Sequence, residues 1–233
     1  MPKKVPKAPE RSDPRAATRR RADGEFPVPA VTRQPAGSLG PRANRTIALI
    51  LDATREVFLN RGYAGTTIDE IAKAGGVSRA SFYTYFPSKR DVLLAVGARS
   101  ASEALTLIRG LRAIEPSLAA LTGWVTRYFE VLDVHGAFAF AWTQAAQEDR
   151  EIRVAGMRTH LDMCRRFGES LGALGGVDVA DPVSSGLAAF ATLERGWDYC
   201  RLYGDAVDRT AIEAQIARNL WGSVRPVPGS RRA

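Results

Sequence analysis

The chain has 233 residues, with 33 lysines and arginines against 25 acidic residues, and a formal net charge of +8. Residues 1–45 carry eleven basic and four acidic side chains (+7), whereas the remaining 188 residues carry 22 and 21 (+1). Two cysteines are too few for a disulfide framework, and the N-terminus lacks the apolar run of a signal peptide. Because no apolar stretch reaches about 18 residues, we expect no transmembrane helix and a cytoplasmic protein.

The first segment, residues 1–43, is predicted to be a disordered basic tail. It holds eight of the thirteen prolines, an arginine run at 19–21 and few large apolar residues. Such a composition cannot bury enough surface to fold. The tail is either simply solvated or a basic arm that follows the phosphates of a nucleic acid, and the sequence leaves both readings open.

Residues 44–92 are predicted to form a small helical domain. Its first helix is expected to begin at Asn44 or Thr46 and to end at Gly62, with apolar residues such as Ile50 and Phe58 at helical spacing. A second helix is expected after Thr67, because the T-x-x-E spacing is that of a capping box.

A tight turn and a third helix follow directly. Gly75-Gly76 stops the second helix, because glycine adopts the left-handed conformation that such a turn requires. Ser78 is the expected N-cap of the third helix, which carries Phe82 and Phe86 inward. Pro87 ends that helix, and the S-x-x-D spacing from Ser88 starts another.

Two short helices joined by a glycine turn form the helix-turn-helix pattern, whose second helix enters the DNA major groove. Three polar residues in a row, Tyr83, Thr84 and Tyr85, cannot share one helix face, so at least one large polar aromatic must point outward. The residues expected to read bases are Arg79, Ala80, Ser81, Tyr83 and Thr84. Those expected to contact phosphates are Thr67, Ser78, Tyr85 and Lys89.

This segment resembles the DNA-binding signature of the TetR family of bacterial transcriptional regulators. The residues that carry the resemblance are Thr67, Ile68, Ile71, Ala72, Ala74, Gly76, Val77, Ser78, Tyr83, Tyr85, Phe86, Lys89 and Leu93. With its first helix, the motif covers roughly residues 45–95. The resemblance implies a homodimeric regulator, by default a repressor, that leaves a palindromic operator when a small effector binds.

Residues 93–225 are predicted to form an all-α effector-binding and dimerisation domain, followed by a polar tail over 226–233. The helix from Lys89 is expected to run towards Ile114, and Pro116 is expected to open the next helix. Further helices are expected over 136–149, 151–174, 182–203 and 208–222. No region alternates with a period of two, so no strand is expected.

The family resemblance implies a small-molecule pocket in this second domain, and its aromatic residues suggest a hydrophobic effector. The wall residues chosen from the sequence are Trp124, Tyr128, Phe138, Trp142 and Trp197, although for any single one of them ordinary core is the more common role. The resemblance also implies a dimer interface on the last two helices, where small residues would permit close approach: Ser184, Gly186, Ala188 and Ala189. Ordinary packing within the chain is the alternative.

Other classes of function find little support in the sequence. His160 and Cys164 lie four apart on one helix, a spacing that can hold a metal, but no second pair accompanies them. A packed cysteine and a surface histidine are therefore expected, without metal or cofactor. No nucleophile or phosphate-loop motif occurs, so an enzyme is not expected. The remaining alternatives are a ligand-independent architectural DNA-binding protein and an activator.

Overall fold

The computed structural model describes residues 39–224, and within this range every regular element is a helix. The prediction of an all-α chain is confirmed, whereas the predicted tails at 1–38 and 226–233 lie outside the described residues. None of the described helices is long and apolar enough to cross a membrane. The α-helices are α1 (Pro41–Arg61), α2 (Ile68–Ala74), α3 (Arg79–Tyr85), α4 (Lys89–Gly110), α5 (Leu118–His135), α6 (Ala137–Glu148), α7 (Arg150–Gly175), α8 (Pro182–Tyr203) and α9 (Arg209–Ser223).

Helix α1 begins earlier than the sequence suggested. It starts at Pro41 rather than at Asn44 or Thr46, so residues 41–43 belong to the helix and not to the tail. Proline suits the first turn because its fixed φ is helical and the amide that it lacks would have no helical partner there. Asn44 instead donates its side-chain amide to the carbonyl oxygen of Leu39, 2.9 Å away.

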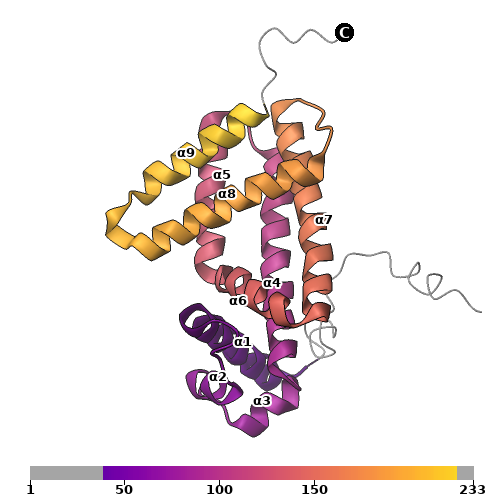
Figure 1. The fold of residues 1–233 in the computed structure, drawn as a ribbon, viewed down its shortest axis with the longest axis vertical. Coiled ribbons are helices and arrows are strands. Elements are labelled where there is room, and N and C mark those ends of the chain that lie inside the picture. Colours follow the sequence, from indigo (N-terminus) through magenta and orange to yellow (C-terminus); the bar gives the residue numbers. More distant parts are fainter. Residues whose placement is uncertain (1–38, 225–233) are drawn as a thin grey trace, which may run out of the picture.

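Helices α1, α2 and α3 pack with the start of α4 into a small domain at the lower end of the molecule (Figure 1). Ile50, Ile71, Phe82 and Phe86 are fully buried in its core, which confirms the inward placement of both phenylalanines. Val92 brings the first turn of α4 into the same cluster. The short helices α2 and α3 are therefore fixed by a core shared with α1 and α4, which short helices need in order to be stable.

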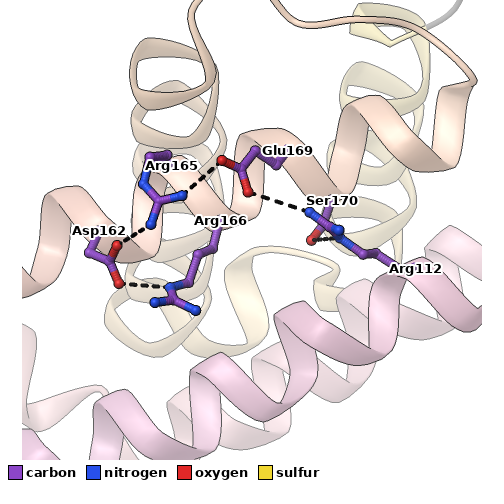
Figure 2. A network of polar contacts seen from close by, with 6 residues as sticks. All are labelled: Arg112, Asp162, Arg165, Arg166, Glu169 and Ser170. Atoms are coloured by element: carbon purple, nitrogen blue, oxygen red, sulfur yellow. Dashed lines mark hydrogen bonds and ion pairs between the residues drawn. The ribbon is translucent and has the colours of Figure 1, made fainter. Parts of the chain in front are cut away.

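Helix α4 passes from the lower domain into the upper one (Figure 1). It ends at Gly110 and is followed by a 3-10 turn (Leu111–Ala113), so it stops short of the expected Ile114. Figure 2 shows how that turn is attached to α7: Arg112 donates to Ser170 over 3.1 Å and lies 3.4 Å from the Glu169 carboxylate. Arg165 in turn bonds Glu169 over 2.9 Å. The far end of α4 is thus held against α7.

The upper domain consists of the rest of α4 and helices α5 to α9, around a large apolar core. Ser117, and not Pro116, caps α5, whereas Asp181 and Asp208 cap α8 and α9 as expected from the sequence. Each cap oxygen accepts from a backbone amide of the first turn, which has no partner inside the helix. Helices α8 and α9 form an antiparallel pair across the upper domain (Figure 1).

Two of the small residues on α8 are used within the chain. Gly186 lies so close to α7 that a Cβ atom would come within 1.8 Å of the Cys164 carbonyl oxygen. Ala189 is also buried, whereas Ser184 and Ala188 are exposed. For Gly186 and Ala189, packing within the chain is therefore the correct reading, because α8 crosses α7 at these positions.

Candidate functional site

Helix α3 is presented by two caps and one glycine turn. The Thr67 amide donates to the Glu70 carboxylate over 2.9 Å, and the Glu70 amide donates to the Thr67 hydroxyl over 3.3 Å. Gly76 has a φ of 61°, in the left-handed region that favours glycine, and an added Cβ would meet no other atom. The turn therefore needs glycine for its backbone conformation and not for lack of room. The Ser78 hydroxyl accepts from the Ser81 amide over 3.0 Å at the start of α3. The capping box, the turn and the second cap match the predicted elements.

The residues chosen as base readers lie on the outer side of this helix. Arg79, Ala80, Tyr83 and Thr84 are exposed, whereas Ser81 is half-buried and its hydroxyl accepts from that of Ser78 over 3.0 Å. Tyr83 keeps 42% of its surface accessible although it follows the fully buried Phe82. A large polar aromatic does point outward, and exposed residues occur in both turns of the helix.

Arg79 is held in place before any ligand arrives. Its guanidinium donates to both carboxylate oxygens of Asp69 over 2.6 and 2.7 Å, and to the Tyr83 hydroxyl over 3.3 Å. The hydrogen bonds to Asp69 raise the pKa of Arg79 above its usual value. Because both partners are exposed, such an ion pair stabilises the fold little and can be exchanged for another acceptor.

Two of the residues expected at phosphates have further contacts. Lys89 donates its ammonium to the carbonyl oxygens of Tyr63 and Thr66 over 2.7 and 2.9 Å, and it lies 4.3 Å from the Tyr63 ring centre. Burial lowers the pKa of Lys89. Tyr85 is half-buried and packs against the core of the lower domain, while Thr67 remains exposed. Lys89 therefore also fastens the loop between α1 and α2, which the sequence did not indicate.

A cavity of about 240 Å³ lies in the upper domain, lined by residues from helices α4 to α8. Tyr128, Phe138 and Trp142 from the sequence-based choice line it. Trp124 and Trp197 do not. Trp124 is buried in the core, where it donates to the Leu107 carbonyl oxygen over 2.9 Å, and Trp197 donates to the Asp133 carboxylate over 2.7 Å.

The cavity also holds three ionisable residues that the sequence did not single out as part of a pocket. His135 donates to or accepts from Glu103 through Nε2 over 2.8 Å, and burial lowers its pKa despite that neighbour. His160 is largely buried beside Trp142, so the expectation of a surface histidine is wrong. Glu194 lies four residues after the buried Phe190, on the same face of α8, and burial raises its pKa to about 7. That spacing was the signal available in the sequence.

Cys164 lies on the same face of α7 as His160, but among the described residues these two do not belong to a group that could hold a metal ion. The thiol is buried, and this raises its pKa to about 11, so it stays protonated at neutral pH. Across residues 39–224, no group of three or more histidine, cysteine, aspartate or glutamate residues could hold a metal ion.

The cavity wall is continuous with the helices that support α1 to α3. Phe138 on α6 packs closely on Gly97 of α4, where a Cβ would come within 2.5 Å of its ring. Further along α6, Gln144 accepts from the Tyr63 amide over 2.7 Å. Arg90 on α4 forms an ion pair with Glu151 on α7. Helices α4 and α6 therefore contact both the cavity and the lower domain.

Comparison with known proteins was made for sequence and for fold. Residues 50–96 match the family model of bacterial regulatory proteins, tetR family. The transcriptional regulator EthR of Mycolicibacterium smegmatis is 31% identical over 128 residues, which are 52% of this chain and 58% of that protein. The transcriptional activator FasR of the same organism is 34% identical over 98 residues, 42% of this chain and 44% of that protein. The chain thus spans about half the length of these curated relatives.

Solved structures resemble the chain over most of its length. A putative TetR-family regulator from Mesorhizobium loti has a TM-score of 0.61 and 17% identity, covering 79% of this chain and 97% of that one. The regulator FadR from Bacillus subtilis, in complex with stearoyl-CoA, has a TM-score of 0.56 and 18% identity, covering 76% and 99%. At these identities the likeness concerns the fold.

Proposed function

We propose that the chain, whose residues 50–96 match the model of the bacterial regulatory proteins, tetR family, is a DNA-binding transcription regulator, in the first instance a repressor, which a small hydrophobic or amphipathic effector releases from a palindromic operator. The observation that carries the proposal is the exposed surface of α3. Arg79, Ala80, Tyr83 and Thr84 face outward from a helix whose Phe82 and capping serine fix it in the domain. A helix of this kind presents side chains to the major groove at its N-terminal end.

Specific recognition calls for different roles among these residues. Arginine can form two hydrogen bonds with guanine, and a small alanine can contact a thymine methyl group. In the free protein, Asp69 on α2 accepts hydrogen bonds from the Arg79 guanidinium. We propose that on DNA the base edge replaces this carboxylate as acceptor, whereas Thr67, Ser78, Tyr85 and Lys89 position the domain on phosphates.

The test begins with operator selection from random duplex DNA, followed by binding measurements on the selected site and on unrelated DNA. We expect Arg79→Ala or Tyr83→Ala to weaken binding to the selected site by about 1–3 kcal/mol and to leave binding to unrelated DNA nearly unchanged. Glu130→Gln, an exposed substitution on α5, serves as the control. Equal losses on both DNAs would refute the base-reading role.

Homodimerisation through α8 and α9 completes the proposal, because a twofold protein matches a palindromic site. Support comes from exposed apolar side chains at the end of α8: Leu202 is 63% and Tyr203 51% accessible, and Tyr199 stacks on Tyr203 at 5.3 Å. We expect Leu202→Arg to convert a dimer into a monomer in analytical ultracentrifugation, because it places a charge in an apolar interface. An unchanged dimer would locate the interface elsewhere.

Effector coupling follows from the placement of the cavity. A ligand that shifts α6 would move Phe138 and Gln144, which are both on α6. Phe138 packs against Gly97 of α4 and Gln144 bonds Tyr63 in the loop between α1 and α2, so the shift would change the spacing of the two recognition helices. Coupling is reciprocal, so the factor by which a ligand weakens operator binding must equal the factor by which operator weakens ligand binding. A thermal-shift screen of lipids, acyl-CoAs, amines and antibiotics identifies ligands. Ligands that bind but never alter operator affinity would support the alternative of a ligand-independent DNA-binding protein.

A further inference from the structure

The cavity is apolar along its walls but is lined by polar groups to which no protein group is hydrogen-bonded among the described residues. Among the described residues, nothing donates a hydrogen bond to the Glu194 carboxylate. His160 Nε2 and His135 Nδ1 are buried atoms without a hydrogen-bond partner. All three residues line the same cavity. Buried polar atoms are normally paired, so unpaired atoms gathered around one cavity indicate a missing partner.

The charged groups around Glu194 do not supply that partner. On α5, Tyr128 is close enough to interact electrostatically with the Glu194 carboxylate, and Cys164 does so from α7, but both are uncharged at neutral pH. On α8 itself, the charge of Arg195 opposes the rise in the pKa of Glu194, but the Arg195 guanidinium bonds Asp198 over 2.8 Å and lies over the Tyr199 ring at 5.7 Å. Within the described part of the chain, no cation is therefore hydrogen-bonded to the Glu194 carboxylate.

The wall itself offers no positive charge to a ligand. No lysine or arginine is among the described residues that line the cavity, whereas Phe138, Trp142 and Tyr128 provide aromatic surface. An anionic head group, such as a carboxylate or the phosphates of an acyl-CoA, would meet the Glu194 carboxylate, while the arginines whose charges act on the wall residues, Arg55, Arg99 and Arg195, stand outside the lining. In this respect the cavity does not suit the class of ligand bound to the FadR structure, stearoyl-CoA.

We propose that the cavity binds an amphiphilic amine, with its ammonium group beside the Glu194 carboxylate and His160, and its apolar body against Phe138 and Trp142. The inference rests on the proposed function only in treating this cavity as the effector site. An ammonium group donates three hydrogen bonds and carries the compensating charge, so it satisfies acceptors that an alcohol satisfies only in part. Aromatic rings at the wall add attraction for a cation.

The experiment is isothermal titration calorimetry of the full chain, without DNA, with octylamine, 1-octanol and octanoate. These three probes share one apolar body and differ only in the charge of the head group. An alkylamine remains protonated near neutral pH, as a lysine side chain does with its reference pKa of about 10.4. We expect octylamine to bind at least about tenfold more tightly than octanol, because a charge-assisted hydrogen bond replaces a neutral one, and octanoate to bind most weakly.

Two variants of Glu194 and one control assign the preference to this residue. Glu194→Gln keeps the size and removes the charge, so the advantage of octylamine over octanol should fall to about threefold or less. Glu194→Asp keeps the charge and should retain the preference for the amine. Glu130→Gln, the same change at an exposed position on α5, should leave all three affinities unchanged. Quenching of tryptophan fluorescence, with Trp142 in the wall, provides a second readout of binding.

The outcomes separate this inference from the proposed function. Octanoate binding as tightly as octylamine, or an amine preference that survives Glu194→Gln in a folded protein, would overturn the inference. Release of the operator by a neutral or anionic ligand that occupies the cavity would overturn the inference and leave the regulator proposal intact. Amine binding that depends on Glu194 but never changes operator affinity would support the inference and count against effector-controlled release.

Discussion

Replacing Glu194 with glutamine should stabilise the protein at alkaline pH. The carboxyl group faces an apolar cavity beside Tyr128, and burial raises its pKa from 4.5 to about 7. Ionising it in the folded state is therefore harder than ionising it in the unfolded chain. One pKa unit corresponds to about 1.4 kcal/mol, so the difference amounts to about 3 kcal/mol once both states are ionised.

The pH dependence of this effect has a definite direction. Below pH 4.5 the group is protonated in both states, and the substitution changes no charge. Between pH 4.5 and about 7 the unfolded chain releases its proton first, so the free energy of unfolding of the natural protein falls as the pH rises. At pH 8 we expect Glu194→Gln to be more stable by about 1–3 kcal/mol, because the amide still loses some hydration on burial.

Urea denaturation of both proteins from pH 4 to 8.5 measures this difference directly. Other groups titrate in the same range, notably His160, whose pKa burial lowers, but their contribution is common to both proteins and cancels in the difference. Glu130→Gln controls for the loss of one surface charge. A constant difference across the pH range would show that folding does not shift the pKa of Glu194, and a variant that loses stability relative to the natural protein between pH 4 and 8 would show that the folded protein favours the ionised carboxylate.

Two further predictions concern residues whose roles the tertiary structure reveals. Lys89→Ala removes both hydrogen bonds to the loop between α1 and α2, so we expect the free energy of unfolding to fall by about 1–2 kcal/mol. Binding to selected and unrelated DNA should weaken alike. Unchanged stability in urea denaturation, or a loss of binding confined to the selected site, would contradict this. Gly186→Ala forces a Cβ to within 1.8 Å of the Cys164 carbonyl oxygen, so we expect urea denaturation to show that the free energy of unfolding falls by about 2 kcal/mol or more. At Gly222 on α9 an added Cβ meets open space, so the control Gly222→Ala should leave the stability unchanged or raise it.

The sequence by itself determined the local structure of the DNA-binding motif. Thr67, Ser78 and Ser88 cap their helices as expected, because each cap is an interaction between a side chain and a backbone amide no more than three residues away. The turn at Gly76 is equally local, since it depends on one backbone conformation. The match to the model of the bacterial regulatory proteins, tetR family, falls on this same segment, where the local pattern is densest.

Only the tertiary structure decided which apolar residues face a cavity and which fill a core. Tyr128 and Trp124 lie four apart on one face of α5 and stack at 5.3 Å, yet one lines the cavity and the other does not. Glu194 and His160 come from different helices and meet the same space only because α8 crosses α7 where Gly186 permits close contact. Helical periodicity gives the buried face of each helix, but the partner of that face depends on how distant helices pack.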